Sequence, residues 1–177
     1  MTIKIANAPC SWGVDYADEI KNPDWKVVLK EISEAGYSYS ELGPYGFLPT
    51  DYFEINDFLQ KIKLNNIGGF IFDNIHDSSQ HTSIKKKIIK SCELLKKLNA
   101  RFFVIIDHIS IDRMKTSGDQ KNSIVLKSDE YIKMTSFIKD ISKICFEEFG
   151  LSPVLHPHAG TYIEYESEID DVIDAVK

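Results

Sequence analysis

A chain of 177 residues with 43% hydrophobic, 27% charged and 11% aromatic side chains has the composition of a soluble globular protein. Its length favours one domain, residues 1–177, with enough apolar material for a sizeable core. The formal net charge of −6 and the pI of about 5.4 argue against broad electrostatic binding to nucleic acid or to an anionic membrane, so we expect neither as a partner.

The cysteines and the N-terminus bear on the compartment. Cys10, Cys92 and Cys145 are odd in number, far apart in the sequence and form no CxxC pair, so they predict no disulfide framework. The first ten residues lack the apolar stretch of a signal peptide, and no segment approaches the roughly 20 apolar residues that span a bilayer. These features predict a cytoplasmic protein.

The predicted elements begin with a strand at residues 3–8. A helix follows at 24–36, with Asp24 as its expected N-cap and Gly36 as the glycine that ends it. A second strand is predicted at 37–43, and a loop rich in glycine and proline comes after it.

The middle of the chain continues the alternation of helices and strands. Thr50 or Asp51 is the expected cap of the second helix. An apolar run predicts the third strand at 67–75, an amphipathic segment predicts the third helix at 83–99, and a second apolar run predicts the fourth strand at 101–109.

The last third of the chain contains one long polar segment, 112–128, which we expect to be a loop or lid. A long helix then runs from its expected N-cap, Ser128, to Gly150. The fifth strand is predicted at 151–156 and the fifth helix at 166–177.

The spacing of the strands indicates an α/β architecture. Most strands start roughly 30–35 residues apart, which is the length of a βα unit. Apolar strands joined by helices predict a parallel sheet that is buried on both faces. Two architectures fit this pattern, an open doubly wound sheet and a partial (βα)₈ barrel, because five units do not close a barrel of typically about 250 residues.

Polar side chains follow several of the predicted strands, at the end where parallel α/β folds place their chemistry. His156 and His158 are two residues apart and therefore point to one face if the strand geometry continues. They are candidates for metal ligands or acid/base groups, or they are histidines that bind loop backbone. Glu41 ends the second strand and is a candidate for binding substrate hydroxyls, accepting a proton or joining a metal shell, or it is an exposed loop acid.

Other residues near strand ends have two interpretations each. His108 is either a ligand contact or a capping residue, and Asp107 beside it favours a structural role. Trp12 is either a stacking surface for a sugar-like ring or a buried apolar plug. Glu164 favours a loop or capping role over a functional one.

Three blocks of the sequence resemble one known group of proteins. The blocks "IANAPCSWG" (5–13), "AGYSYSELGPYGFLPTD" (35–51) and "LHPHAGTYIEYESEID" (155–170) together resemble the xylose-isomerase-like TIM-barrel superfamily of sugar phosphate isomerases and epimerases. Within it they are most similar to the inosose dehydratase branch. The resemblance implies a partial (βα)₈ barrel, with five parallel strands and surrounding helices that form about the first five-eighths of the family barrel.

The resemblance also implies a site and a chemistry. It implies a divalent metal, Mn²⁺ or Co²⁺ in type, at the barrel mouth, and a sugar or inositol derivative as substrate. In isomerase and epimerase relatives, a block like "ENHAGT" supplies a metal-binding glutamate, and His156 takes its place here, with His158 matching the histidine that follows. This departure favours a dehydratase over a two-glutamate epimerase. It gives Glu41 and His158 catalytic roles, Trp12, Glu41 and His108 substrate contacts, and His156 a metal-ligand role.

The family's other metal ligands come from strands six to eight, which lie outside the five predicted units. We therefore expect a truncated product, or a second chain or oligomer that completes the barrel. Alternative functions are a sugar isomerase or epimerase, a non-catalytic sugar-binding α/β module, and an endonuclease of the same superfamily. The acidic balance of the chain argues against the endonuclease.

Overall fold

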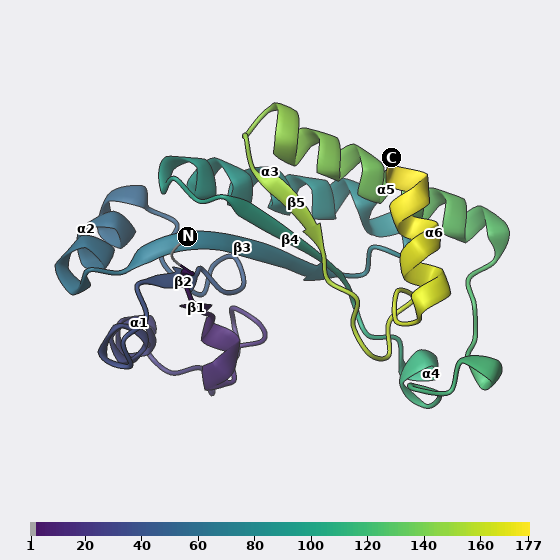
Figure 1. Ribbon diagram of the computed structural model, residues 1–177, viewed down its shortest axis with the longest axis horizontal. Helices are drawn as coiled ribbons and strands as arrows, with labels where there is room; N and C mark the ends of the chain where they lie inside the picture. The colour runs from purple at the N-terminus through teal and green to yellow at the C-terminus, as the bar shows by residue number, and fades with distance from the viewer. Residues whose placement is uncertain (1–2) are drawn as a thin grey trace.

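The computed structural model describes residues 3–177. Its five strands form one parallel sheet in the order β1-β2-β3-β4-β5 (Figure 1). The elements are β1 (Ala6–Asn7), η1 (Pro9–Trp12), α1 (Trp25–Glu34), β2 (Tyr39–Glu41), α2 (Tyr52–Ile62), β3 (Asn65–Asp73), η2 (Ser78–Gln80), α3 (His81–Lys97), β4 (Phe102–Asp107), α4 (Ile111–Met114), η3 (Gln120–Asn122), α5 (Ser128–Glu147), β5 (Ser152–Leu155) and α6 (Glu166–Val176). In this part of the chain, no helix has the length and apolar character needed to cross a membrane.

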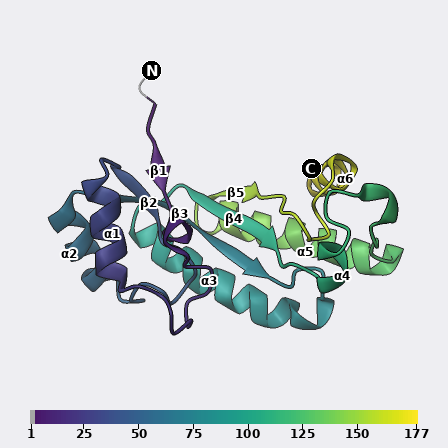
Figure 2. The same ribbon diagram turned by 90° about the horizontal axis from the view of Figure 1, so that it is seen from below.

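The strand order decides between the two architectures that the sequence left open. A doubly wound sheet reverses its strand order at a switch point, whereas here every strand pairs with its neighbours in sequence. Sequential parallel order with the crossover helices gathered on one side is the arrangement of a (βα)₈ barrel (Figure 2). The prediction of a partial barrel with five parallel strands is confirmed.

The two faces of the sheet differ in burial. Along β4, Phe103 and Ile105 point toward the helices and are almost fully buried, because strand side chains alternate between faces. Val104 and Ile106 point to the other face, are only partly buried and line a pocket. The helical face is thus the core, and the opposite face is the inner wall of the incomplete barrel.

The helix boundaries follow local capping chemistry. Asp24 accepts hydrogen bonds from the backbone N–H groups of Lys26 and Val27, as predicted for an N-cap. Asp51, not Thr50, caps α2. The predicted cap Ser128 is wrong: α5 already begins at this residue, and the preceding backbone N–H is bound by the Glu130 carboxylate at 3.1 Å.

β2 is shorter than predicted, Tyr39–Glu41 rather than 37–43, and the first strand and the polar segment after β4 also differ from their predicted form. β1 is confined to Ala6–Asn7 rather than 3–8, because only β2 pairs with it among the described residues. The polar segment 112–128 is not an unstructured loop, since it contains η3 and most of the short helix α4. It is tied to the loop after β5 by the carboxylate of Glu164, which accepts hydrogen bonds from Gly118 N–H and Gly160 N–H, each at 2.8 Å.

The outer strand β5 has prolines on its free side. Ser152 N–H donates to the carbonyl of Arg101, just before β4, and His156 N–H donates to the carbonyl of Ile105 within β4. The alternate residues therefore turn their backbone groups away from β4. Two of those alternate residues are Pro153 and Pro157, which have no N–H to donate. Each proline removes one ladder hydrogen-bond donor from this side, with which no further strand pairs within residues 3–177.

Candidate active site

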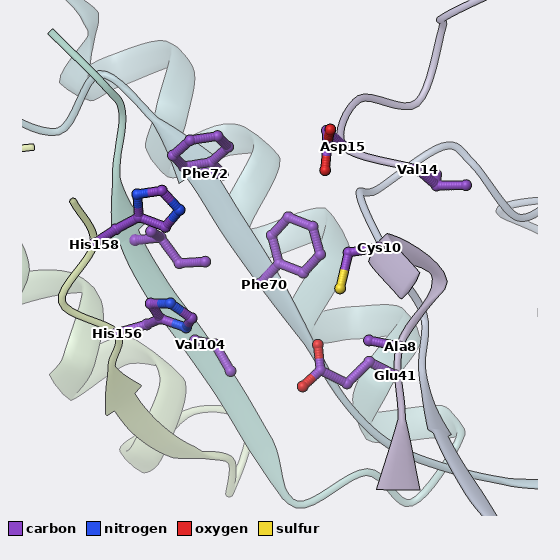
Figure 3. A pocket seen from close by; sticks show the side chains of 11 residues that line it. Ala8, Cys10, Val14, Asp15, Glu41, Phe70, Phe72, Val104, His156 and His158 are labelled. Atoms are coloured by element: carbon purple, nitrogen blue, oxygen red, sulfur yellow. The ribbon is translucent and has the colours of Figure 1, made fainter. Parts of the chain in front are cut away.

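An irregularity between β2 and β3 sets the position of Glu41. Ser40 pairs with Asn66 but Glu41 pairs with Gly68, so β3 carries one extra residue at this point. The Asn66 amide donates to the carbonyls of Ser40 and Gly68 and so occupies backbone acceptors beside the bulge. Bulges beside functional sites re-aim neighbouring side chains, and here the Glu41 carboxylate points into a pocket (Figure 3).

The pocket has a volume of about 280 Å³ and lies on the inner face of the sheet, toward the C-terminal ends of the strands (Figure 3). Apolar side chains of β3 and β4 form its floor, and polar groups from β2 and from the segment after β5 face each other across it. Its lining consists of Ala8, Cys10, Val14, Asp15, Glu41, Phe70, Phe72, Val104, Ile106, His156 and His158. A hollow of this kind, apolar with a few converging polar groups, is typical of small-molecule sites.

The Glu41 carboxyl is electrostatically strained. Burial raises its pKa, and no hydrogen bond or opposite charge from residues 3–177 offsets that effect. A half-buried carboxyl without a partner is poised to exchange a proton with a ligand at a pH nearer neutrality.

His156 and His158 lie on the same face and both line the pocket, as their spacing predicts. The Nδ1 of His158 is 2.9 Å from the carbonyl oxygen of Ala159, and since a carbonyl only accepts, Nδ1 carries the proton. The Nε2 of His158 is therefore the nitrogen with the free lone pair. Burial is the larger cause that lowers the pKa of His156, and repulsion from His158 when that ring is protonated adds to it, so the neutral form of His156 is favoured.

Glu41→Gln is expected to raise the thermal midpoint of unfolding at neutral pH. An unfolded glutamate ionises with a pKa of 4.5, whereas burial raises the pKa in the folded state, so folding disfavours the charged form. Relative to the glutamine variant, the wild type should lose stability as the pH rises from 4.5 through the folded pKa, and the difference should be absent at lower pH. Thermal unfolding followed by circular dichroism at about pH 4 and about pH 7.5 measures this.

The control for this prediction is Glu34→Gln. Glu34 is an exposed glutamate that forms only an i,i+4 pair with Lys30 at 3.5 Å, and its replacement should bring no gain. An equal or lower midpoint for Glu41→Gln at neutral pH would show that the carboxylate has a stabilising partner in solution.

Two residues with predicted substrate contacts lie elsewhere. The indole N–H of Trp12 donates to the Glu31 carboxylate of α1 at 2.6 Å, so the ring is held against the helical layer and does not line the pocket. Both ring nitrogens of His108 are occupied, Nδ1 by its neighbour's carbonyl oxygen at 3.0 Å and Nε2 by the Tyr16 hydroxyl at 2.8 Å. The His108 ring stacks on Phe72 at 4.7 Å between ring centroids, so it packs against one of the residues that line the pocket.

Sequence reasoning did not single out some groups that the fold brings together. Cys10 and Asp15 also line the pocket, although no pattern around them indicates chemistry. Asp107 is fully buried and binds the His76 ring at 2.8 Å, which agrees with its predicted structural role. His76 lies in the loop after β3, yet its side chain is mostly buried, because the ring is bound to Asp107.

The donor set of the pocket is only part of a metal shell. Neutral imidazole nitrogens such as those of His156 and His158 are suitable ligands for a divalent metal. Catalytic zinc sites commonly have three protein ligands, and structural zinc sites have four. Among residues 3–177, no three His, Cys, Asp or Glu side chains come together in a way that could hold a metal ion.

Comparison with known proteins gives the chain its relatives. No protein-family model matches it. It is 25% identical over 175 residues to inosose dehydratase of Bacillus thuringiensis (strain Al Hakam), covering 98% of this chain and 57% of that protein. It is 27% identical over 176 residues to the rhizopine catabolism protein MocC of Rhizobium meliloti, covering 96% of this chain and 51% of that protein.

Solved structures match the fold more fully than the sequence. A xylose isomerase-like TIM barrel protein from Mycobacterium smegmatis in complex with magnesium superposes with a TM-score of 0.72 at 14% identity, covering 98% of this chain and 61% of that one. The IOLI protein with a binding zinc atom gives 0.70 at 14% identity, with 98% and 59% covered. D-psicose 3-epimerase from Clostridium cellulolyticum H10 gives 0.66 at 13% identity, with 99% and 60% covered.

The chain has the fold of a partial xylose isomerase-like TIM barrel. The resemblance read from the sequence blocks at 5–13, 35–51 and 155–170 is thereby confirmed. This partial xylose isomerase-like barrel spans about half to three-fifths of the length of its curated relatives and structural neighbours.

Proposed function

We propose that residues 1–177 are the first five βα units of a sugar- or cyclitol-processing lyase that dehydrates a cyclic keto-polyol, as an inosose dehydratase does. One observation carries the proposal: Glu41 and His158 face the same pocket from opposite sides, each at the C-terminal side of the sheet. Two proton-exchanging groups across one hollow are what the removal of water next to a ketone requires. The similarity to inosose dehydratase supports this reaction class.

The geometry gives each residue a role in the proposed reaction. His158, whose Nδ1–H is held by Ala159, presents a basic Nε2 that removes the proton from the carbon beside the ketone. Glu41, whose pKa burial raises, is the acid that protonates the departing hydroxyl, which leaves as water. The apolar floor of Phe70 and Phe72 stacks against the C–H face of the ring and keeps solvent away.

The proposed cofactor is a divalent metal, Mn²⁺ or Co²⁺ in type, to which this chain contributes the imidazole of His156. Magnesium and zinc in two structural neighbours support a divalent metal. When bound, such a metal supplies Lewis-acid polarisation of a substrate oxygen. Burial lowers the pKa of His156, which favours the neutral imidazole whose lone pair can bind a metal.

The remaining ligands require further strands, so we propose that additional βα units complete the barrel, from the same polypeptide, a second chain or another copy. The lengths of the relatives support this. The pocket lining of the described part contains no lysine or arginine, which favours an uncharged sugar or inositol derivative over a phosphate-bearing partner such as nucleic acid. The three free cysteines fit the proposed cytoplasmic location.

Two other functions have specific support. A sugar isomerase or epimerase is favoured by the fold of D-psicose 3-epimerase. A non-catalytic sugar-binding module is favoured by the shortage of metal donors in the described residues. Product analysis separates the three, because only the lyase releases water from the substrate.

The test supplies the missing units. Residues 1–177 are co-expressed with the carboxy-terminal βα units of an inosose dehydratase, and loss of water from inosose is followed by mass spectrometry. Turnover is expected in the complex only. Glu41→Gln and His158→Ala should each lower kcat on the order of 100-fold, the contribution of one positioned acid or base.

The matched control is Glu93→Gln, which removes an exposed carboxylate on α3 and should leave kcat unchanged. Wild-type rates in both site variants would rule out the assigned roles. Rearranged substrate without water loss would establish the isomerase, and saturable binding without any product would establish the binding module.

A further inference from the structure

Two cysteines that are far apart in the sequence meet in the core. The Sγ atoms of Cys92 on α3 and Cys145 on α5 are 3.7 Å apart, and both side chains are fully buried. These residues share no motif and are 53 positions apart, so no sequence pattern indicates the pair. We propose that Cys92 and Cys145 are an oxidation site at which a disulfide covalently joins α3 to α5.

The arrangement of the helices makes the bond sterically accessible. α3 and α5 lie side by side over the outer face of the sheet (Figure 1). A disulfide needs an S–S distance of about 2.05 Å, so the two sulfurs must move closer together from their present separation of 3.7 Å. Rotation of the two side chains and a small shift of α3 and α5, each of which has one face in solvent, provide that movement without breaking a strand pair.

The step balances with a small-molecule disulfide as the oxidant. One protein thiolate attacks the reagent disulfide and releases the first reagent thiol. The second protein thiolate then displaces the other half, so that one protein S–S bond forms, two S–H bonds are lost and the reagent is reduced to two thiols. The two protein sulfurs give up two electrons and both protons end on the reagent.

Burial controls when this reaction takes place. The hydrogen bond with Cys145 and burial raise the pKa of the Cys92 thiol, so the closed protein holds little of the nucleophilic thiolate. The reagent must also reach the sulfurs, which requires α3 and α5 to separate locally. The rate should therefore follow the opening of these two helices, and the finished bond should be equally shielded from reductants.

The disulfide would join the helices that precede and follow β4 in the chain. The bridged loop between residues 92 and 145 includes β4, α4 and η3. Closing a long loop restricts the unfolded chain, so the oxidised form should unfold at a midpoint about 5–10 °C higher.

The experiment uses Cys10→Ser protein, in which only the buried pair remains. It is incubated with oxidised glutathione in urea below the unfolding transition, then unfolded, alkylated and digested. The expected product has lost two hydrogens and contains a peptide pair joined through Cys92 and Cys145, and formation should be at least tenfold slower without urea. The midpoint of the purified oxidised protein is then compared with that of the reduced protein.

The matched control is Cys10→Ser with Cys145→Ser, which should give only a glutathione adduct at Cys92. The proposal is overturned if Cys92 and Cys145 are both alkylated after oxidation at every urea concentration, or if each bears its own glutathione. A joined pair with a lower midpoint than the reduced protein would overturn the claim that the bond fits the native packing.

Discussion

Replacement of Arg113 by methionine should lower the free energy of unfolding by about 3–5 kcal/mol, the usual cost of removing one member of a buried ion pair. The guanidinium is fully buried and donates to three acceptors: the carbonyl of Thr161 at 2.7 Å, the carbonyl of Ile124 at 2.9 Å and the carboxylate of Glu168 at 2.8 Å. Methionine fills a similar volume but satisfies none of them. Glu168 would then be left with an uncompensated, largely buried charge.

The loss should spread beyond the ion pair. Arg113 lies over the rings of Tyr162 and Tyr165, at 5.5 and 4.9 Å from their centroids, so it also packs the loop that follows β5. The same Glu168 carboxylate binds the backbone N–H of Glu164, at the start of α6. Removing the guanidinium therefore loosens the joint between α4, this loop and α6.

Urea denaturation of wild type and variant, each fitted to a two-state transition, measures the difference. Arg101→Met is the matched control, because Arg101 is exposed and its guanidinium lies only over the ring of Phe102. This change should cost less than about 1 kcal/mol. Equal losses in the two variants would show that the buried network contributes no more than a surface arginine.

Asp107→Asn is the second large effect, expected to cost about 3 kcal/mol at pH 6, because a buried acceptor of several hydrogen bonds becomes a partial donor. The carboxylate accepts from the His76 ring at 2.8 Å, from His76 N–H at 3.1 Å and from Tyr162 N–H at 3.3 Å. An amide has one oxygen and one NH₂ group. In either orientation its NH₂ faces a backbone N–H, so at least one donor loses its partner.

The pH dependence follows from His76. Burial alone would lower the pKa of this histidine, but the hydrogen bond and negative charge of Asp107 outweigh it, and the pKa is raised above 6.5. The stabilisation by protonated His76 is thus fully present below pH 6.5, and it is lost as the pH rises through the folded pKa. The wild type should lose stability over that interval, and Asp107→Asn should be nearly flat there.

Urea midpoints taken between about pH 5.5 and about pH 9 give both quantities. Asp112→Asn is the control, since the Asp112 side chain is 60% exposed and pairs only with Lys115. It should change neither the midpoint nor its pH profile appreciably. A wild-type profile as flat as that of Asp107→Asn would mean that His76 stays neutral in the folded protein.

Much of the architecture could be predicted because local signals agreed with tertiary packing. Asp24 and Asp51 cap helices where the sequence places them, and the apolar run around Phe103 and Ile105 forms a central strand. The repeated βα spacing predicted that the strands are parallel, but it could not distinguish an open sheet from a barrel. That distinction depends on which edge each new strand joins, and no short-range pattern encodes it.

The candidate site was predictable only in part. The two-residue period of a strand places His156 and His158 on one face, and both line the pocket with Glu41. Trp12 and His108 have the right residue types at the right strand ends, yet partners distant in sequence, Glu31 and Tyr16, hold them elsewhere. Whether such a side chain enters the pocket or binds a distant partner depends on the tertiary structure, which a local sequence pattern does not contain.

The prolines at the outer side of β5 make that edge selective. An arriving strand meets carbonyl oxygens at Pro153, Leu155 and Pro157 but a single N–H, that of Leu155. If two copies of β5 came together by their free edges, carbonyl oxygens would face carbonyl oxygens. This disfavours the edge-to-edge pairing by which an unprotected edge strand can form fibrils. This edge therefore favours a partner strand that has free backbone N–H donors. The selection depends on backbone groups and does not require any side-chain contact.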